Sequence, residues 1–188
     1  MALLSVLAFT HAVLRDHLRP GDNALDGTAG NGHDTLLLAQ CVGEYGKVWA
    51  FDVQPAALEH THQRLLDNHA VAQTSLIATG HQHLADYVDA PLSAAVFNFG
   101  WLPGGDKSCT TQPDTSVAAL GAALHLLKTG GVLVSVLYPG HEAGRIEAAA
   151  IEQWVAALSQ KQFAVLRYGF ANQKNAPPYL LAIEKLPY

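Results

Sequence analysis

The sequence is poor in cysteine and has no long apolar runs. Its 188 residues include two cysteines, Cys41 and Cys109, too few for a disulfide framework or a zinc site, so we expect a reducing, cytoplasmic setting. No apolar run is long enough to cross a bilayer, and the apolar start of the chain lacks the basic residues of a secretory signal. We therefore expect a soluble protein without membrane contact.

Charged residues are also scarce, and basic ones most of all. Lysine and arginine total 11 against 16 aspartates and glutamates, and the formal net charge is −5. This balance argues against a protein that holds nucleic acid mainly by a broad basic surface, although it does not exclude a small basic patch. The 49% hydrophobic content suits a chain with a substantial core, and the length predicts a single domain over residues 1–188.

Apolar strands alternate with helical patterns along the chain. An amphipathic first helix is indicated by Ala2, Leu3, Val6, Leu7, His11, Leu14 and Leu18. Later helices are expected near 34–42, 55–69, 113–128 and 144–160, and strands near 23–28, 47–52, 75–79, 92–99, 132–137, 163–170 and 179–184. This order predicts an α/β, doubly wound, mostly parallel sheet. The last two strands are too close in sequence for a crossover helix, so they should form an antiparallel hairpin.

A glycine-rich turn follows the first of these strands. The strand ends at Asp26, the turn contains Gly30 and Gly32, and a helix begins about Asp34. Glycine lets the backbone approach a ligand closely, and the helix directs its N–H groups back at the site. The next strand ends in Asp52, where a carboxylate can accept hydrogen bonds from both hydroxyls of a ribose. Together these features indicate a nucleoside-cofactor site.

The spacing of the turn favours S-adenosylmethionine (SAM) over NAD. Counted from Gly30, the dinucleotide pattern requires a third glycine where this chain has Thr35. The alternative pattern of methyltransferases, acid-x-Gly-x-Gly-x-Gly, is matched by Asp26, Gly30 and Gly32, with Thr28 in place of the first glycine. Seven strands that end in an antiparallel hairpin are the Rossmann-like variant of this SAM-dependent class.

A second constellation, residues 98–107, follows the fourth strand. Asn98 could accept a hydrogen bond from an amine that receives the methyl group. Trp101 could stack on a base, or could simply cap the core. Asp106 or His141 could accept the proton that the amine must lose, and Lys107 could contact phosphate or pair with Asp106. Arg15 and Arg19 are the best candidates for a basic edge.

Three segments resemble the signatures of the MnmM-like family of methyltransferases: residues 25–35, 98–107 and 138–142. The resemblance spans essentially the whole chain. It implies SAM-dependent methylation of the exocyclic amine of 5-aminomethyl-2-thiouridine at the tRNA wobble position, giving 5-methylaminomethyl-2-thiouridine. Trp101 stands where the family usually has tyrosine.

The candidate site residues fall into three groups. The cofactor group contains Asp26, Gly30, Gly32 and Asp52, which the turn and the second strand indicate. The resemblance supports Asp52 and adds Asn31, His33, Gln54 and His81. The catalytic group is Asn98, Asp106 and His141, and the substrate group is Trp101, Pro103, Lys107 and Tyr138. No metal site is expected, because the histidine pairs lack accompanying carboxylates or cysteines.

Other functions remain open from the sequence. One is a SAM-dependent methyltransferase of a small metabolite, which the acidic balance favours, or of rRNA. Another is a SAM-binding partner subunit without activity, and a nicotinamide oxidoreductase ranks lowest. Apolar residues of the first helix and of the last hairpin could also pack a homodimer.

Overall fold

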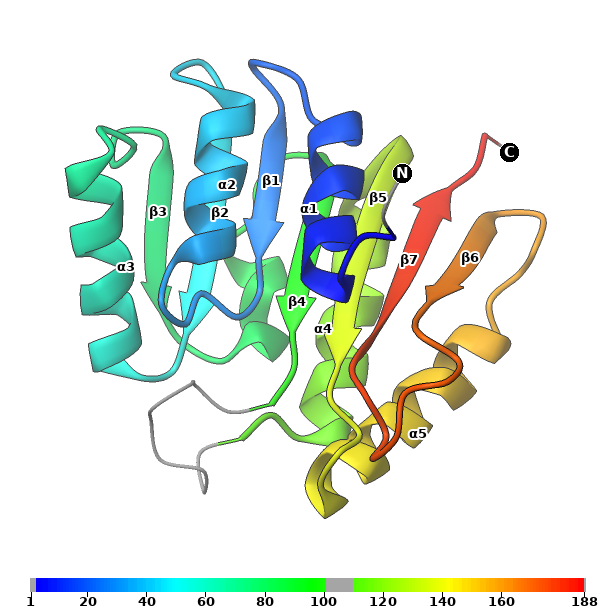
Figure 1. The fold of residues 1–188 in the computed structure, drawn as a ribbon. Helices are drawn as coiled ribbons and strands as arrows, with labels where there is room; N and C mark the ends of the chain where they lie inside the picture. The colour runs from blue at the N-terminus through cyan, green and yellow to red at the C-terminus, as the bar shows by residue number, and fades with distance from the viewer. Residues whose placement is uncertain (1–2, 101–109, 188) are drawn as a thin grey trace.

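A computed structural model describes residues 3–100 and 110–187 of the chain. One seven-stranded sheet, in the order β3-β2-β1-β4-β5-β7-β6, forms its centre (Figure 1). The strands are β1 Asn23–Asp26, β2 Lys47–Asp52, β3 Thr74–Ala78, β4 Leu92–Asn98, β5 Leu127–Leu137, β6 Phe163–Tyr168 and β7 Tyr179–Lys185. The α-helices are α1 Val6–His17, α2 His33–Val42, α3 Pro55–Asp67, α4 Pro113–Leu126 and α5 Glu142–Ala156, and a 3-10 helix, η1, spans His81–Asp86.

The predicted sheet is confirmed. Strands β1 to β5 pair in parallel, whereas β7 pairs antiparallel with both β5 and β6. Only a short loop joins β6 to β7, so the chain can return only by reversing direction.

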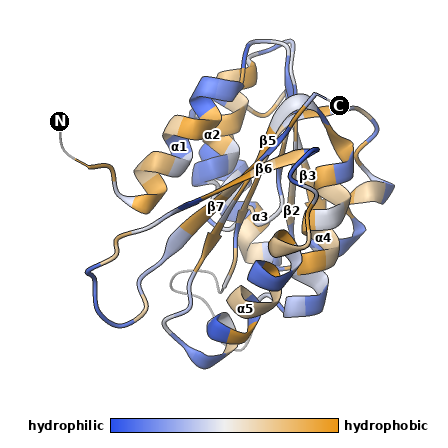
Figure 2. Cartoon of the chain, turned by 90° about the vertical axis from the view of Figure 1, so that its right-hand side faces the viewer, coloured by the Kyte–Doolittle hydropathy of each residue, from blue (hydrophilic) through white to orange (hydrophobic). Residues whose placement is uncertain are grey.

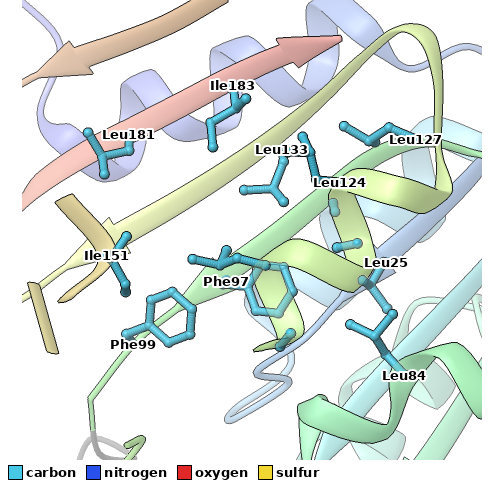
Figure 3. Packing of buried hydrophobic residues seen from close by; sticks show 14 of the residues in the cluster. Leu25, Leu84, Phe97, Phe99, Leu124, Leu127, Leu133, Ile151, Leu181 and Ile183 are labelled. Carbon is cyan, nitrogen blue, oxygen red and sulfur yellow. The ribbon is translucent and has the colours of Figure 1, made fainter. Parts of the chain in front are cut away.

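Helices cover both faces of the sheet, and the alternation of side chains along each strand decides which helix each residue meets. On β5, Leu133 packs in the cluster formed with α4, α5 and η1, while Val132 and Val134 pack in the cluster formed with α1, α2 and α3. Figure 3 shows part of the first cluster, in which Phe97 and Phe99 lie near Ile151 of α5. Because both faces are buried, the inner strands are apolar over nearly their whole length.

Strand β5 begins earlier than the sequence predicts. We expected Gly130 and Gly131 to separate helix α4 from a strand beginning at residue 132, but β5 begins at Leu127 and contains both glycines. The register against β4 shifts between Leu92 and Ala94, and Gly130 has φ +75°. The glycines therefore accommodate a bulge inside the strand. Helix α5 also ends at Ala156, short of the predicted residue 160, and η1 was not predicted.

The strand order reverses at β1, which lies between β2 and β4. In doubly wound sheets, ligands bind beyond the carboxyl ends of the strands at this reversal. Helix α1 runs antiparallel to β1 (Figure 1). Its first turns therefore lie beside the carboxyl ends of the parallel strands, and its last turn lies at the opposite edge, beside their amino ends. At the opposite edge, Asp22 accepts the backbone N–H of Arg19 and pairs with Lys128. The basic edge expected from Arg15 and Arg19 is therefore remote from the site.

Strand β6 forms one edge of the sheet and faces the viewer in Figure 2. Its Val165 and Leu166 are 42% and 49% exposed, unlike the buried residues of its neighbour β7. In the described part of the chain, no helix has the length and apolar character needed to cross a membrane.

Candidate functional site

A cavity of about 1030 Å³ opens at the carboxyl edge of the sheet, where β1, β2 and β4 end. It is lined by nine of the predicted site residues: Gly30, Asn31, His33, Asp52, Gln54, His81, Asn98, Tyr138 and His141. Asp26 and Gly32 do not line it. Trp101, Pro103, Asp106 and Lys107 lie outside the described residues. The volume is at the upper end of the range for small-ligand sites, so it can hold a nucleoside cofactor together with part of a second substrate.

Asp52 lines this cavity and is held by the backbone. Its Oδ2 accepts the N–H of Gly30 at 2.9 Å, and its Oδ1 accepts the N–H of Gln54 at 2.9 Å. Each carboxylate oxygen has two acceptor sites, so both keep capacity for further donors. The carboxylate is thus oriented before any ligand arrives, as binding of two adjacent ribose hydroxyls requires.

The glycine-rich turn serves packing as well as access. Gly30 and Gly32 have φ +53° and +76°, and Gly32 is the N-cap of α2. A Cβ at Gly32 would lie 2.8 Å from the Cα of Thr61, so α2 and α3 can approach only because this residue has no side chain. The carbonyl of Asn31 in the same turn accepts the Nε–H of Arg64 at 2.7 Å.

Replacing Gly32 with alanine is therefore expected to destabilise the protein by about 2–4 kcal/mol, because left-handed strain and overpacking add. Chemical denaturation measures the loss. Gly121→Ala is the matched control: Gly121 lies inside α4, and a Cβ added there would meet no atom within 4 Å, so we expect no loss and a gain of up to about 1 kcal/mol. Equal stability of the two variants would contradict the packing role of Gly32.

Asp26 lies behind the cavity, with 1% of its surface exposed. Its Oδ1 accepts the N–H of Thr28 at 3.0 Å, and its Oδ2 accepts the hydroxyl of Thr35 at 2.6 Å. Thr35, the residue that breaks the dinucleotide pattern, thus ties the strand end to the first turn of α2. Burial, with repulsion from Asp34, raises the pKa of Asp26 to about 7. The side chain shapes the turn from within.

The raised pKa predicts a pH-dependent stability. The native state keeps the proton on Asp26 between its ordinary pKa of 3.8 and about 7, whereas the unfolded chain loses it. The stability that this bound proton contributes is full below pH 3.8 and is lost as pH rises through about 7. The free energy of unfolding falls with a slope near 1.4 kcal/mol per pH unit. Urea denaturation of the wild type and of Asp26→Asn at several pH values should show the wild type losing stability relative to the variant as pH rises. A constant difference would mean that native Asp26 is ionised throughout.

Four hydrogen-bonded side chains that line the cavity form a row. Asp34 Oδ1 contacts the Nε2 of His11 at 2.6 Å, and its Oδ2 accepts the amide N–H of Asn98. The Oδ1 of Asn98 accepts the hydroxyl of Tyr138 at 3.3 Å, and its backbone N–H is donated to the Thr28 hydroxyl at 2.7 Å. The row joins α1, α2, β4 and the loop after β5. Sequence reasoning found Asn98 and Tyr138 but assigned His11 only to an amphipathic face.

Two predicted histidines have structural partners. His81 is 8% exposed, its Nδ1 lies 3.3 Å from the carbonyl of Gly27, and its ring meets Phe97 and Phe99 edge-on. Burial lowers the pKa of His81, which favours the neutral ring. His141 is the N-cap of α5, where its Nδ1 accepts the N–H of Gly144 at 3.0 Å. Its expected role as proton acceptor stays a prediction.

Glu147 was missed by sequence reasoning, because one glutamate in a helix resembles a surface residue. It is 3% exposed and accepts the hydroxyls of Thr111 and Ser116 at 2.9 and 2.6 Å. Burial raises its pKa. Thr111 also binds Gly100 through two hydrogen bonds, so Glu147 fixes the junction between the end of β4 and the start of α4.

The loop between β6 and β7 also reaches the cavity. Asn175 and Ala176 line it, with φ of +64° and +47°. Left-handed backbone is unfavourable for alanine and persists where the surroundings impose it, often at functional sites. Among the described residues, no group of three or more His, Cys, Asp or Glu side chains could hold a metal ion.

Comparison with known proteins assigns the chain to a family. The family described as "Putative rRNA methylase" matches residues 48–184. The chain belongs to this family. It is also 34% identical over 178 residues to an Arabidopsis thaliana protein named tRNA (mnm(5)s(2)U34)-methyltransferase, chloroplastic, covering 89% of this chain and 65% of that protein.

Two solved structures of the same size are also similar. A Clostridium thermocellum protein with the same description is 39% identical, with a TM-score of 0.97 over 99% of this chain and 100% of that one. A Streptococcus mutans protein solved in complex with S-adenosylhomocysteine (SAH) is 37% identical, with a TM-score of 0.91 over 98% of this chain and 100% of that one. The chain has the fold of the SAM-dependent methyltransferases, as its sequence predicts.

Proposed function

We propose that this family member transfers a methyl group from SAM to the exocyclic amine of 5-aminomethyl-2-thiouridine at the wobble position of tRNA. The observation that carries the proposal is that one cavity holds both the oriented Asp52 carboxylate and the polar row through Asn98. The name of the Arabidopsis relative supports the substrate. Because the chain spans 65% of that relative, the activity and the tRNA partner are proposals for this chain.

The residues present fit SAM. Asp52 receives the ribose hydroxyls, and Gly30, Asn31, His33, Gln54 and His81 line the same cavity. Asp26 and Gly32 act from behind the cavity by shaping the turn. The neutral His81 places no positive charge beside a sulfonium cofactor. When bound, SAM supplies an electrophilic methyl group, and the protein's own task is chiefly to align the acceptor and exclude water.

Asn98 is the residue we assign to aligning the acceptor. Asp34 and Tyr138 fix its amide orientation, because the N–H of the amide binds the carboxylate and the carbonyl oxygen binds the phenol. That oxygen keeps a second acceptor site for an amine hydrogen. Trp101, Pro103 and Lys107 remain proposed contacts of the nucleotide, and Asp106 and His141 are the candidate proton acceptors that the sequence offers.

The proposal is tested by incubating purified protein and SAM with tRNA from a strain that accumulates 5-aminomethyl-2-thiouridine. Mass spectrometry of the digested nucleosides should show the gain of one methyl group on that nucleoside. Fully modified tRNA, unmodified rRNA and a metabolite extract serve as parallel acceptors. Methylation of rRNA or of a metabolite, with the wobble nucleoside unchanged, would overturn the tRNA assignment and retain the methyltransferase.

We further propose that residues 1–188 form one domain and that two copies pair through β6. A single neighbouring strand, β7, binds β6 within the described residues, and the outer strand carries exposed Val165 and Leu166. Antiparallel pairing of two such edges gives a closed two-fold dimer. Light scattering should show a dimer that Leu166→Lys dissociates, and a monomeric wild type would exclude the dimer.

The cytoplasmic location stays a prediction that a tRNA substrate supports, although the Arabidopsis relative is named as chloroplastic.

A further inference from the structure

The polar row contains a histidine that neither the motifs nor the family resemblance assigns. His11 lies in α1, lines the cavity, and has a side chain that is 29% exposed. Its Nε2 contacts Asp34 Oδ1 at 2.6 Å. Among the described residues, its other ring nitrogen, Nδ1, has no hydrogen-bond partner.

The contact with Asp34 decides what this imidazole can do. A carboxylate that accepts the N–H of one ring nitrogen fixes the tautomer, so that the other nitrogen carries the lone pair and can accept a proton. The same carboxylate then stabilises the positive ring that results. Asp34 binds Asn98 through its second oxygen, so the histidine is linked to the residue that aligns the acceptor amine.

We propose that His11 is the proton acceptor for the substrate amine, with Asp34 as its positioning residue; the assignment rests on the proposed function. An aliphatic amine is an ammonium ion near neutral pH and has no lone pair with which to attack. It gives one proton to His11. The nitrogen lone pair then forms the new N–C bond to the methyl group while the C–S electron pair returns to sulfur. The product leaves as a secondary ammonium ion, and His11 returns its proton to water.

The other candidates are less well placed within the described structure. The Nδ1 of His141 accepts the N–H that begins α5, so that nitrogen serves the helix. Glu147 is 3% exposed and binds two hydroxyls away from the row. The sequence places His11 on the apolar face of the first helix, but nothing in that pattern indicates that the helix lines the cavity.

The ionisable groups around His11 are few. Asp34 of α2 faces it directly, Tyr138 reaches it through Asn98, and Asp26 acts on Asp34 by repulsion. His33 lines the same cavity, where Arg64 lies 3.3 Å from its Nε2. Lys128 and Lys185, on the strands β5 and β7 behind α1, bind Asp22 and main-chain carbonyls at the opposite edge of the sheet. Asp34 therefore dominates the electrostatics at the ring.

The test compares His11→Gln with His17→Gln, a variant of the same helix whose Nδ1 binds the carbonyl of Val13. At neutral pH we expect His11→Gln to lower kcat/KM about 100-fold, within the range of acid–base contributions. The defect should shrink as pH approaches the pKa of the amine, because a free amine needs no acceptor. The kcat/KM of Asp34→Asn should also be reduced at neutral pH and approach the wild-type value at high pH. The kcat/KM of His17→Gln should match the wild type at every pH.

One further measurement separates this role from misfolding and from failure of the proposed function. Calorimetry should give unchanged SAH affinity for His11→Gln. A pH-independent defect or a normal rate for His11→Gln would overturn the assignment. A wild type that binds SAH but methylates no wobble nucleoside would instead overturn the proposed function.

Discussion

Asn98→Ala is expected to lower the rate of methyl transfer by about 100-fold or more while leaving the affinity for SAH within about threefold of the wild type. The side chain occupies the end of β4, and its amide is oriented by Asp34 and Tyr138. Removing it leaves the amine without an acceptor that fixes its direction. It also leaves Asp34 with one fewer donor, which disturbs the residue that holds His11. Both effects act on the acceptor side of the cavity.

Single-turnover assays with tRNA measure the rate, and calorimetry with SAH measures binding. Gln160→Ala is the matched control, because Gln160 is an exposed amide just before β6, at the opposite edge of the sheet. An unchanged rate for Asn98→Ala would remove its aligning role. A large loss of SAH affinity would show that Asn98 belongs to the cofactor half of the site.

Asp52→Ala is expected to weaken SAH binding about 100-fold or more. Hydrogen bonds to a charged group contribute about 1.5–3 kcal/mol each, and the carboxylate is placed to accept two from the ribose. The variant also leaves the N–H groups of Gly30 and Gln54 without their acceptor, so the turn loses its orientation. The SAH affinity of Asp52→Asn, which keeps one acceptor oxygen, should lie between those of Asp52→Ala and the wild type.

Calorimetric titration with SAH measures these affinities directly. Glu59→Gln, which removes an exposed carboxylate from α3 outside the cavity, should bind SAH as the wild type does. Near-normal affinity of Asp52→Ala would contradict the ribose assignment and leave the oriented carboxylate without a ligand.

The fold could be predicted from the sequence because its signals are local. Apolar strands, glycine turns and helix periodicity each lie within a dozen residues, and the short β6–β7 link dictated the antiparallel hairpin. The predicted start of β5 was wrong because Gly130 and Gly131 resemble the end of a helix. In the structure they accommodate a bulge against β4. That distinction depends on a partner strand remote in sequence.

The part of the cavity lined by Gly30 and Asp52 could be predicted for the same reason, since Gly30 follows the first and Asp52 ends the second of two consecutive strands in one βαβ unit. The polar row through His11 could not. His11 and Asp34 meet only because α1 packs beside α2, and Glu147 of α5 binds Thr111, which lies just before α4. No local pattern marks such pairs. Asp26 shows the converse: its motif was recognised, but its burial, and hence its role within the turn, required the fold.

The most direct test of the account is a crystal structure of the protein with SAH and an anticodon stem-loop that carries 5-aminomethyl-2-thiouridine. We predict the ribose hydroxyls of SAH on Asp52, and the uridine amine between Asn98 and His11 with the SAH sulfur in line. A ribose bound away from Asp52, or a wobble uridine outside the cavity, would contradict the account.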